Sequence, residues 1–233
     1  MRIPTTRGTC ERCGTSGTRA VLRKHLAACS APMPEDSRRG RRRHAAAAAP
    51  GLLIEVVGRP KAYWLFPGVA HDAKLSDLDA WLRDIWLECC DHLSQFVIGP
   101  TRYSSVPSPT FSLKARAQSM HVGVGKVLRP GLTFQHHYDF GSTTVVDLSV
   151  VGELIVPVAS QAIVLLASND APKILCSQCA EPAVKLCAEC DTDAGVAFLC
   201  SACAAQHECG EEMLRPVVNS PRMGVCGYSG PGA

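Results

Sequence analysis

Residues 52–66 read LLIEVVGRPKAYWLF, in which two apolar runs flank a turn at Gly58 and Pro60. Short runs of β-branched, aromatic and aliphatic residues are typical of strands, and Gly with Pro between them favours a reversal of the chain. We therefore expect two antiparallel strands here, in a sheet that begins at Leu52. Further strand-like runs are FVIG at 96–99, LTFQHHYDFG at 132–141, TTVVDLSVVGE at 143–153 and AIVLLA at 162–167.

One segment among these runs has helical periodicity. Residues 76–91 carry apolar side chains at three- and four-residue spacing, and Ser76 with Asp79 resembles a capping box. Cys89 and Cys90 would be packing residues of this helix, with a redox role as the alternative. The pattern predicts an α+β domain over residues 52–168, a central antiparallel sheet with one main packing helix.

The first 29 residues have the ligand spacing of a small zinc module. Cysteine and histidine are the ligands that zinc prefers, and four of them complete a tetrahedral shell. A unit of this size cannot fold on burial of apolar side chains alone, so metal binding would also be folding. The four ligands follow the pattern C-x2-C-x11-H-x3-C and are Cys10, Cys13, His25 and Cys29.

Residues 30–51, SAPMPEDSRRGRRRHAAAAAPG, are expected to be a linker because Pro, Arg and Ala dominate and Pro50 with Gly51 closes the stretch.

A second cysteine-rich module is predicted over residues 170–212, followed by a Pro- and Gly-rich tail over 213–233. Its three C-x2-C pairs and one C-terminal His and Cys suit two zinc ions. The eight candidate ligands are Cys176, Cys179, Cys187, Cys190, Cys200, Cys203, His207 and Cys209.

The pairing of these ligands stays open at this point. In a cross-braced arrangement the first and third C-x2-C pairs share one ion, and the second pair shares the other with His207 and Cys209. Sequential sites are the alternative, and Cys226 could replace Cys209 as the last ligand. The segment AVKLCAECDTDAGVAFLCSACAAQH at 183–207 resembles a B-box-type zinc finger, although His207-x1-Cys209 departs from the usual widely spaced histidines. The resemblance implies structural zinc and contacts with other proteins.

The central domain resembles a second family. LSDLDAWLRDIWLECCDHLSQFVIG at 75–99 and YDFGSTTVVDLSVVG at 138–152 are similar to the plasmid pRiA4b ORF-3-like family, in which a helix ending in an HL-x-x-F step precedes a Y-D-F-G strand. The resemblance implies a bacterial protein, often encoded beside mobile elements. It implies no reaction, because no biochemical activity is established for the family.

A candidate catalytic set lies in the same region. If residues 136–139 are extended, His137 and Asp139 share one face and could converge with His92 on a metal or acid–base site. The alternative is that Asp139 fixes a turn before Gly141 and that His92 stabilises the end of the helix. No Gly-rich phosphate loop, nucleophile elbow or H-E-x-x-H motif is present.

Charge is unevenly distributed along the chain. Residues 1–44 contain 11 Lys and Arg against 3 Asp and Glu, whereas residues 169–233 contain 4 against 8. The basic end predicts nonspecific contact with DNA or RNA, and the acidic module predicts a protein partner. The candidate nucleic-acid contacts are Arg19, Arg23, Lys24, Arg38, Arg39, Arg41, Arg42 and Arg43.

The 13 cysteines and the first 30 residues together indicate the compartment. No apolar signal-peptide core is visible, and C-x2-C pairs suit metal better than disulfides, so we expect a cytoplasmic protein with no membrane segment. We expect three structural zinc ions and an adaptor or regulator that binds rather than catalyses. The alternatives are an enzyme with the His/Asp site and a pure protein–protein scaffold.

Overall fold

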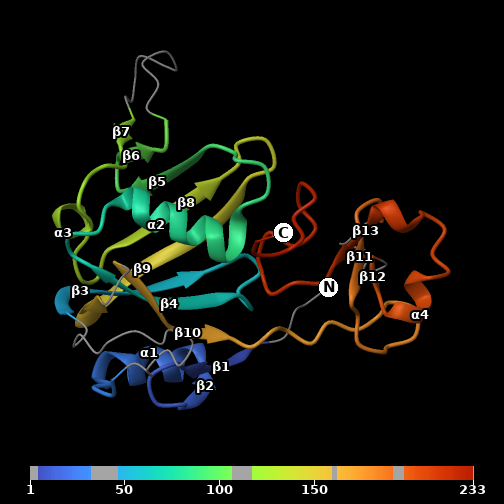
Figure 1. The fold of residues 1–233 in the computed structure, drawn as a ribbon, viewed down its shortest axis with the longest axis horizontal. Coiled ribbons are helices and arrows are strands. Elements are labelled where there is room, and N and C mark those ends of the chain that lie inside the picture. The colour runs from blue at the N-terminus through green and yellow to red at the C-terminus, as the bar shows by residue number, and fades with distance from the viewer. Residues whose placement is uncertain (1–4, 33–46, 107–116, 159–161, 191–196, 233) are drawn as a thin grey trace, which may run out of the picture.

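The computed structural model describes residues 5–32, 47–106, 117–158, 162–190 and 197–232. Its centre is a ten-stranded sheet in the order β2-β1-β10-β4-β3-β9-β8-β5-β6-β7 (Figure 1), which confirms the predicted α+β class. Neighbouring strands are antiparallel except for the β6–β7 pair. The strands are β1 (Arg7–Cys10), β2 (Ser16–Thr18), β3 (Ala47–Val57), β4 (Trp64–Ala70), β5 (Ser94–Ile98), β6 (Thr101–Ser104), β7 (Gln118–Ser119), β8 (Thr133–Tyr138), β9 (Thr144–Val158) and β10 (Ile163–Asn169).

The predicted hairpin at residues 52–66 is confirmed. β3 pairs with β4 in the register Leu52↔Val69 and Val56↔Leu65. Side chains alternate across β3, so that Leu52, Ile54 and Val56 belong to one apolar cluster, and Leu53 belongs to a second one. The sheet is therefore buried on both faces at this hairpin, which is why the run is almost continuously apolar.

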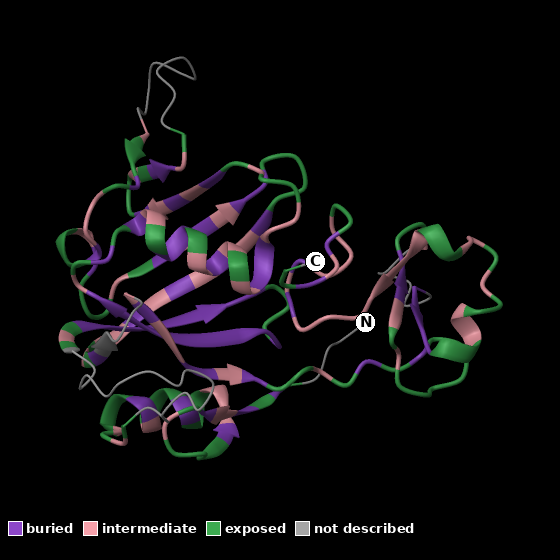
Figure 2. Ribbon diagram, in the orientation of Figure 1, coloured by how far each residue is buried: buried purple, intermediate pink, exposed green. Residues whose placement is uncertain are grey.

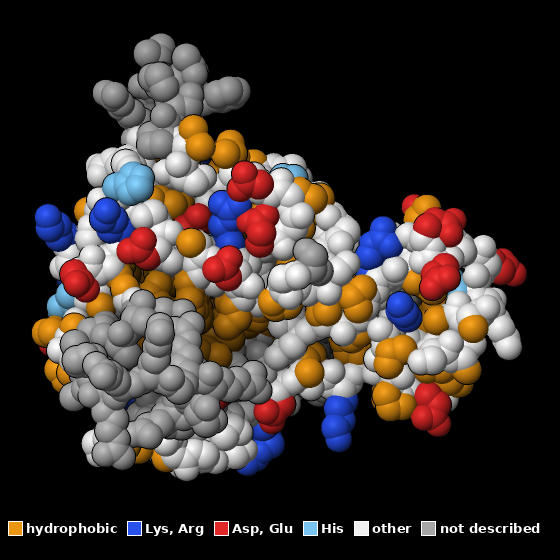
Figure 3. Space-filling view, in the orientation of Figure 1, with side chains coloured by type: hydrophobic (Ala, Val, Ile, Leu, Met, Phe, Trp, Pro, Cys, Tyr) orange, Lys and Arg blue, Asp and Glu red, His pale blue; other side chains and the backbone are white. Residues whose placement is uncertain are grey.

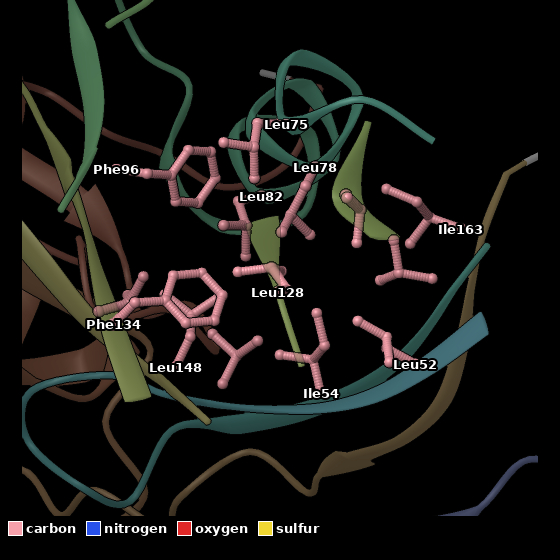
Figure 4. Close-up of a cluster of buried hydrophobic side chains, with 14 of the residues drawn as sticks. Leu52, Ile54, Leu75, Leu78, Leu82, Phe96, Leu128, Phe134, Leu148 and Ile163 are labelled. Atoms are coloured by element: carbon pink, nitrogen blue, oxygen red, sulfur yellow. The ribbon is translucent and has the colours of Figure 1, made fainter. Parts of the chain in front are cut away.

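Helix α2 (Leu75–Leu82) covers one face of the sheet. Leu75, Leu78 and Leu82 point from the helix toward Ile54 and Phe134 (Figure 4), and Figure 2 shows the outward side of the helix exposed. The helix is shorter than the predicted 76–91 segment, because it continues as a π-helix, η1 (Arg83–Leu87), and then becomes extended. Its cap also differs from the predicted Ser76–Asp79 pair, since the backbone N–H of Lys74 donates to the Asp77 carboxylate at 2.8 Å. A short helix, α3 (Val124–Val127), lies farther along the chain.

The N-terminal unit packs on the other face of the sheet. Its helix α1 (Arg19–Ala28) buries Leu22 and Leu26 against Leu53, Phe66 and Leu166. β1 pairs with β10 and adds itself to the edge of the sheet. The unit is therefore continuous with the central sheet rather than tethered to it by a linker alone.

The predicted linker over 30–51 ends earlier than expected. β3 begins at Ala47, and Pro50 and Gly51 lie opposite Ile155 and Leu154 of β9. The long partner strand β9 offers a backbone ladder that the alanine and proline composition does not reveal. A Cβ on Gly51 would lie 2.4 Å from the carbonyl oxygen of Val69, so this closely packed position requires glycine.

The C-terminal module is a second, three-stranded sheet in the order β12-β11-β13. Its last strand lies beyond residue 212, where the sequence interpretation begins the tail. The tail then returns to the central domain (Figure 1), where Ser220, Arg222 and Tyr228 are buried. The elements of this region are β11 (Lys185–Cys187), β12 (Phe198–Leu199), α4 (Ser201–Ala204), the 3-10 helix η2 (Glu211–Met213) and β13 (Leu214–Pro216).

Candidate metal centres

The N-terminal cysteines and histidine lie close together in space. Cys10 ends β1, Cys13 follows in the turn, His25 lies in the last turn of α1, and Cys29 is the residue that ends this helix. Their ligand atoms all lie within 4.8 Å of one another. The Sγ of Cys13 is 3.2 Å from Nε2 of His25 and 4.0 Å from Sγ of Cys29.

These distances fit a tetrahedral zinc ion. Zn–S bonds of about 2.3 Å and Zn–N bonds of about 2.0 Å place two sulfur ligands about 3.8 Å apart, and sulfur and nitrogen about 3.5 Å apart. The sulfur–nitrogen distance of 3.2 Å and the sulfur–sulfur distance of 4.0 Å in the N-terminal group both lie close to these values. The hydroxyl of Thr15, which lies 3.2 Å from Sγ of Cys13, is the main cause that lowers the pKa of this thiol to about 6. The surroundings of Cys13 thus favour its thiolate, which is the form that binds metal.

The eight candidate ligands of the C-terminal module form two groups. Cys176, Cys179, Cys200 and Cys203 make one, and the remaining four make the other. In the first group, Sγ of Cys179 is 3.6 Å from Sγ of Cys200 and 3.7 Å from Sγ of Cys203. In the second group, Sγ of Cys190 is 3.4 Å from Nε2 of His207. The second group is Cys187, Cys190, His207 and Cys209.

The two groups are crossed along the chain. The first and third C-x2-C pairs share one group, while the second pair lies with His207 and Cys209. This geometry is the cross-braced alternative, and it places Cys209 rather than Cys226 in the module. Cys187, a ligand of the second group, ends β11. β11 pairs with β12, and Cys200 of the first group directly follows β12, so the short sheet connects the two groups.

The thiols within each group differ in acidity. Burial raises the pKa of Cys176, but hydrogen bonds from the backbone N–H groups of Cys200, Gln178 and Cys179 and from the Cys179 side chain together lower it to about 6. Hydrogen bonding with Cys200 raises the pKa of Cys203 to about 12. Crowded thiols therefore share their protons unequally, and a bound cation would displace the protons that remain.

Two of the predicted nucleic-acid contacts are engaged within the protein. The guanidinium groups of Arg19 and Arg23 form ion pairs with the buried carboxylate of Glu55, the former at 3.4 Å. Glu55 also accepts a hydrogen bond from Ser149 at 3.1 Å. Lys24 is exposed. The arginine run, Arg38, Arg39, Arg41, Arg42 and Arg43, lies outside the described residues, and nucleic-acid contact stays a prediction.

This ion pair gives a first expected outcome. Replacing Glu55 with Gln should lower the free energy of unfolding by about 1–2 kcal/mol, since both arginines are partly exposed and water screens the lost attraction. Urea unfolding measures the change. Glu153→Gln, at an exposed position on β9, is the matched control and should leave stability unchanged. Equal stability of the two variants would show that Glu55 does not hold α1 on the sheet.

The candidate catalytic residues do not all converge. Strand β8 ends at Tyr138, and Asp139 has a φ of 64°, which turns its side chain toward Arg222 and His92. Oδ2 of Asp139 is 3.7 Å from Nε2 of His92 and 2.8 Å from the Arg222 guanidinium. His137 lies on the opposite face of the sheet, where its ring contacts Gln135 at 3.1 Å.

Sequence reasoning missed a fourth group of ligands. The group is Cys89, Cys90, His92 and Cys226. The shortened helix explains why the predicted packing role fails for Cys90, which is exposed. The local signal is the C-C-x-H spacing at 89–92, but the fourth ligand lies far away in the sequence.

The fold and these groups define an α+β protein with four Cys/His groups, within the described residues, that are able to hold metal ions. No family model and no curated protein matches the chain. Among solved structures, it is similar to the crystal structure of a protein of unknown function, MM3350, from Methanosarcina mazei Go1. The identity is 13% and the TM-score is 0.43, over 53% of this chain and 70% of that chain. The resemblance to the pRiA4b ORF-3-like family stays a prediction.

The described helices are at most ten residues long. Across the described parts of the chain, none is both long enough and apolar enough to serve as a transmembrane span.

Proposed function

We propose that this protein is a zinc-dependent adaptor, in which three structural zinc ions shape the N-terminal unit and the C-terminal module. The observation that supports the proposal is the composition of each group. Four cysteine or histidine ligands fill a tetrahedral shell, so no position is left for a reactive water or a substrate. Zinc at these positions would stabilise surfaces for binding rather than catalyse a reaction.

The C-terminal module is the surface that best suits a protein partner. Leu175 and Val184 are 52% and 44% exposed, and they lie on paired segments, since Leu175 bridges Pro182 and the N–H of Ala183 donates to the carbonyl of Ile174. Acidic side chains are spread over the same module (Figure 3). An apolar anchor with an acidic rim suits a partner that presents apolar and basic residues.

Metal content of single variants tests the zinc proposal. Cys13→Ser, Cys179→Ser and Cys190→Ser should each lower the zinc content of the purified protein by at least one ion per chain, because each removes one ligand from a different group, and by about two ions where the loss of one unfolds the C-terminal module. Inductively coupled plasma mass spectrometry measures zinc, and quantitative amino-acid analysis measures protein. Ser201→Ala, at an exposed position of α4 between two ligands, should keep the full content.

Two results would contradict the proposal. One is a wild-type protein that carries no zinc after purification without chelators. The other is an unchanged zinc content in all three serine variants, which would mean that the metal lies elsewhere.

A further inference from the structure

The chain that leaves η1 forms a preorganised turn. Asp91 has a φ of 55°, and its backbone N–H donates to the Glu88 carboxylate at 2.6 Å. The same carboxylate accepts from the hydroxyl of Tyr138 at 3.0 Å and from Nε of Arg83 at 2.6 Å. The turn that carries Cys89, Cys90 and His92 is therefore held by a network that does not depend on the cysteines.

The C-terminal segment brings a fourth ligand to this turn. Ser220 donates to the carbonyl of Trp86 at 2.7 Å, which places the segment beside the end of η1. Arg222 and Tyr228 are buried on either side of Cys226, whose φ of 51° is a left-handed conformation. Cys226 itself is exposed, so packing does not explain its position.

The four ligand atoms lie close enough together to share one tetrahedral zinc ion. They lie within 4.8 Å of one another, and Nε2 of His92 is 3.3 Å from Sγ of Cys226. The corresponding sulfur–nitrogen distances at Cys13 and Cys190 are 3.2 Å and 3.4 Å. The donor set of three thiols and one imidazole is also that of the N-terminal group.

A buried cation complements the charge that such a site would carry. Zinc with three thiolates and a neutral histidine has one net negative charge. The Nη2 of Arg222 lies 3.3 Å from Sγ of Cys89, and its side chain has no exposed surface. A fixed guanidinium at this distance stabilises the thiolate and orients it, as outer-shell partners of metal ligands commonly do.

We infer that Cys89, Cys90, His92 and Cys226 bind a fourth zinc ion, which fastens the C-terminal segment to the sheet domain. The C-terminal module leaves and rejoins the domain at one place, because the side-chain amide of Asn169 donates to the side-chain oxygen of Asn219 at 2.7 Å. The ion would close the chain just beyond that point, joining residues 134 positions apart. The ion would thus fix the position of the chain where the C-terminal module joins the sheet domain. This site shares no ligand with the three groups above.

Zinc content and hydrogen exchange of Cys226→Ser test the inference. The variant should carry three zinc ions where the wild-type protein carries four, and amides of residues 220–228 should lose protection. Cys226→His keeps a ligand at this position and should restore the fourth ion. Ser229→Ala, in the same segment, is the matched control and should keep both the ion and the protection. Because Cys226 is exposed, the serine variant should fold.

Other outcomes would overturn the inference and leave the three structural sites standing. One is equal zinc content in the wild-type protein and Cys226→Ser. Another is a disulfide among Cys89, Cys90 and Cys226 in the native protein purified under reducing conditions, detected by mass after thiol alkylation.

Discussion

Removal of zinc from the first C-terminal group should unfold the whole C-terminal module while the ten-stranded sheet stays folded. Cys203→Ser is the change that tests this, because Cys203 belongs to the group formed with Cys176, Cys179 and Cys200. Structural zinc contributes about 10–16 kcal/mol of apparent binding free energy in small zinc fingers, and this is folding free energy. Hydrogen exchange read by mass spectrometry should show complete loss of amide protection in β11, β12 and β13.

The expected loss follows from how little else holds the module together. Its strands have only two or three residues each, and one apolar cluster consists of Ile174, Leu186, Ala197 and Phe198. A second cluster combines Leu199 with cysteines of the first group. Apolar surface of this extent cannot offset the conformational entropy of some forty residues.

Two controls belong to the hydrogen-exchange experiment on Cys203→Ser. Amides of β3, at the centre of the large sheet, report on the rest of the molecule and should keep their protection in the variant. Ser201→Ala, in the same short helix as Cys203, should leave the module protected. Full protection of β11 in Cys203→Ser, or in the wild-type protein with excess chelator, would show that the module folds without metal.

The sequence predicts those parts of this fold that depend on local pattern. The strands at 52–66 and 132–167 follow from apolar runs bounded by turn residues, and the α+β class follows from them. The end of helix α2 does not follow from the sequence, because the apolar spacing continues to Cys89. In the structure, Arg83 forms ion pairs with Glu88 and Asp91, and a π-helix followed by a turn accommodates these pairs. Side-chain contacts of this kind are not visible in periodicity.

Pairing between distant segments also escapes sequence reasoning. Ala47 begins a strand because β9 lies beside it, and β1 joins the sheet because β10 offers an edge. The spacing of cysteines and histidines predicts twelve ligand candidates, and the structure brings those residues together in three groups. The sequence offers Cys226 only as a substitute for Cys209, since nothing local connects it to His92.

Arg222→Met should lower the free energy of unfolding of the sheet domain by about 3–5 kcal/mol, because it leaves a buried carboxylate without its partner. The guanidinium of Arg222 donates to Oδ2 of Asp139 at 2.8 Å and to the hydroxyl of Thr144 at 2.9 Å. It also lies 4.8 Å from the centre of the Tyr138 ring. Urea unfolding followed by the fluorescence of buried Trp64 and Trp86 measures the change.

The double variant Asp139→Asn with Arg222→Met separates charge from packing. Asparagine is neutral and tolerates the positive φ of Asp139, so the double variant should recover a large part of the loss. Arg129→Met, at an exposed position, is the control for the substitution itself and should change stability by less than about 0.5 kcal/mol. A double variant no more stable than Arg222→Met would mean that lost packing, not an unpaired charge, is responsible.

The effect of Arg222→Met should depend on pH in one direction. Hydrogen bonding from Arg222 lowers the pKa of Asp139 below its usual value of about 3.9. A carboxyl whose pKa is lower in the folded state stabilises the fold fully above its unfolded pKa, and this contribution is lost as the pH falls through the lowered value. The difference in stability between wild type and Arg222→Met should therefore be full at neutral pH and shrink below about pH 4, where the unfolded carboxyl takes up its proton. A difference that stays constant through this range would locate the role of Arg222 in its contacts with Thr144 and Tyr138, and not in its pairing with Asp139.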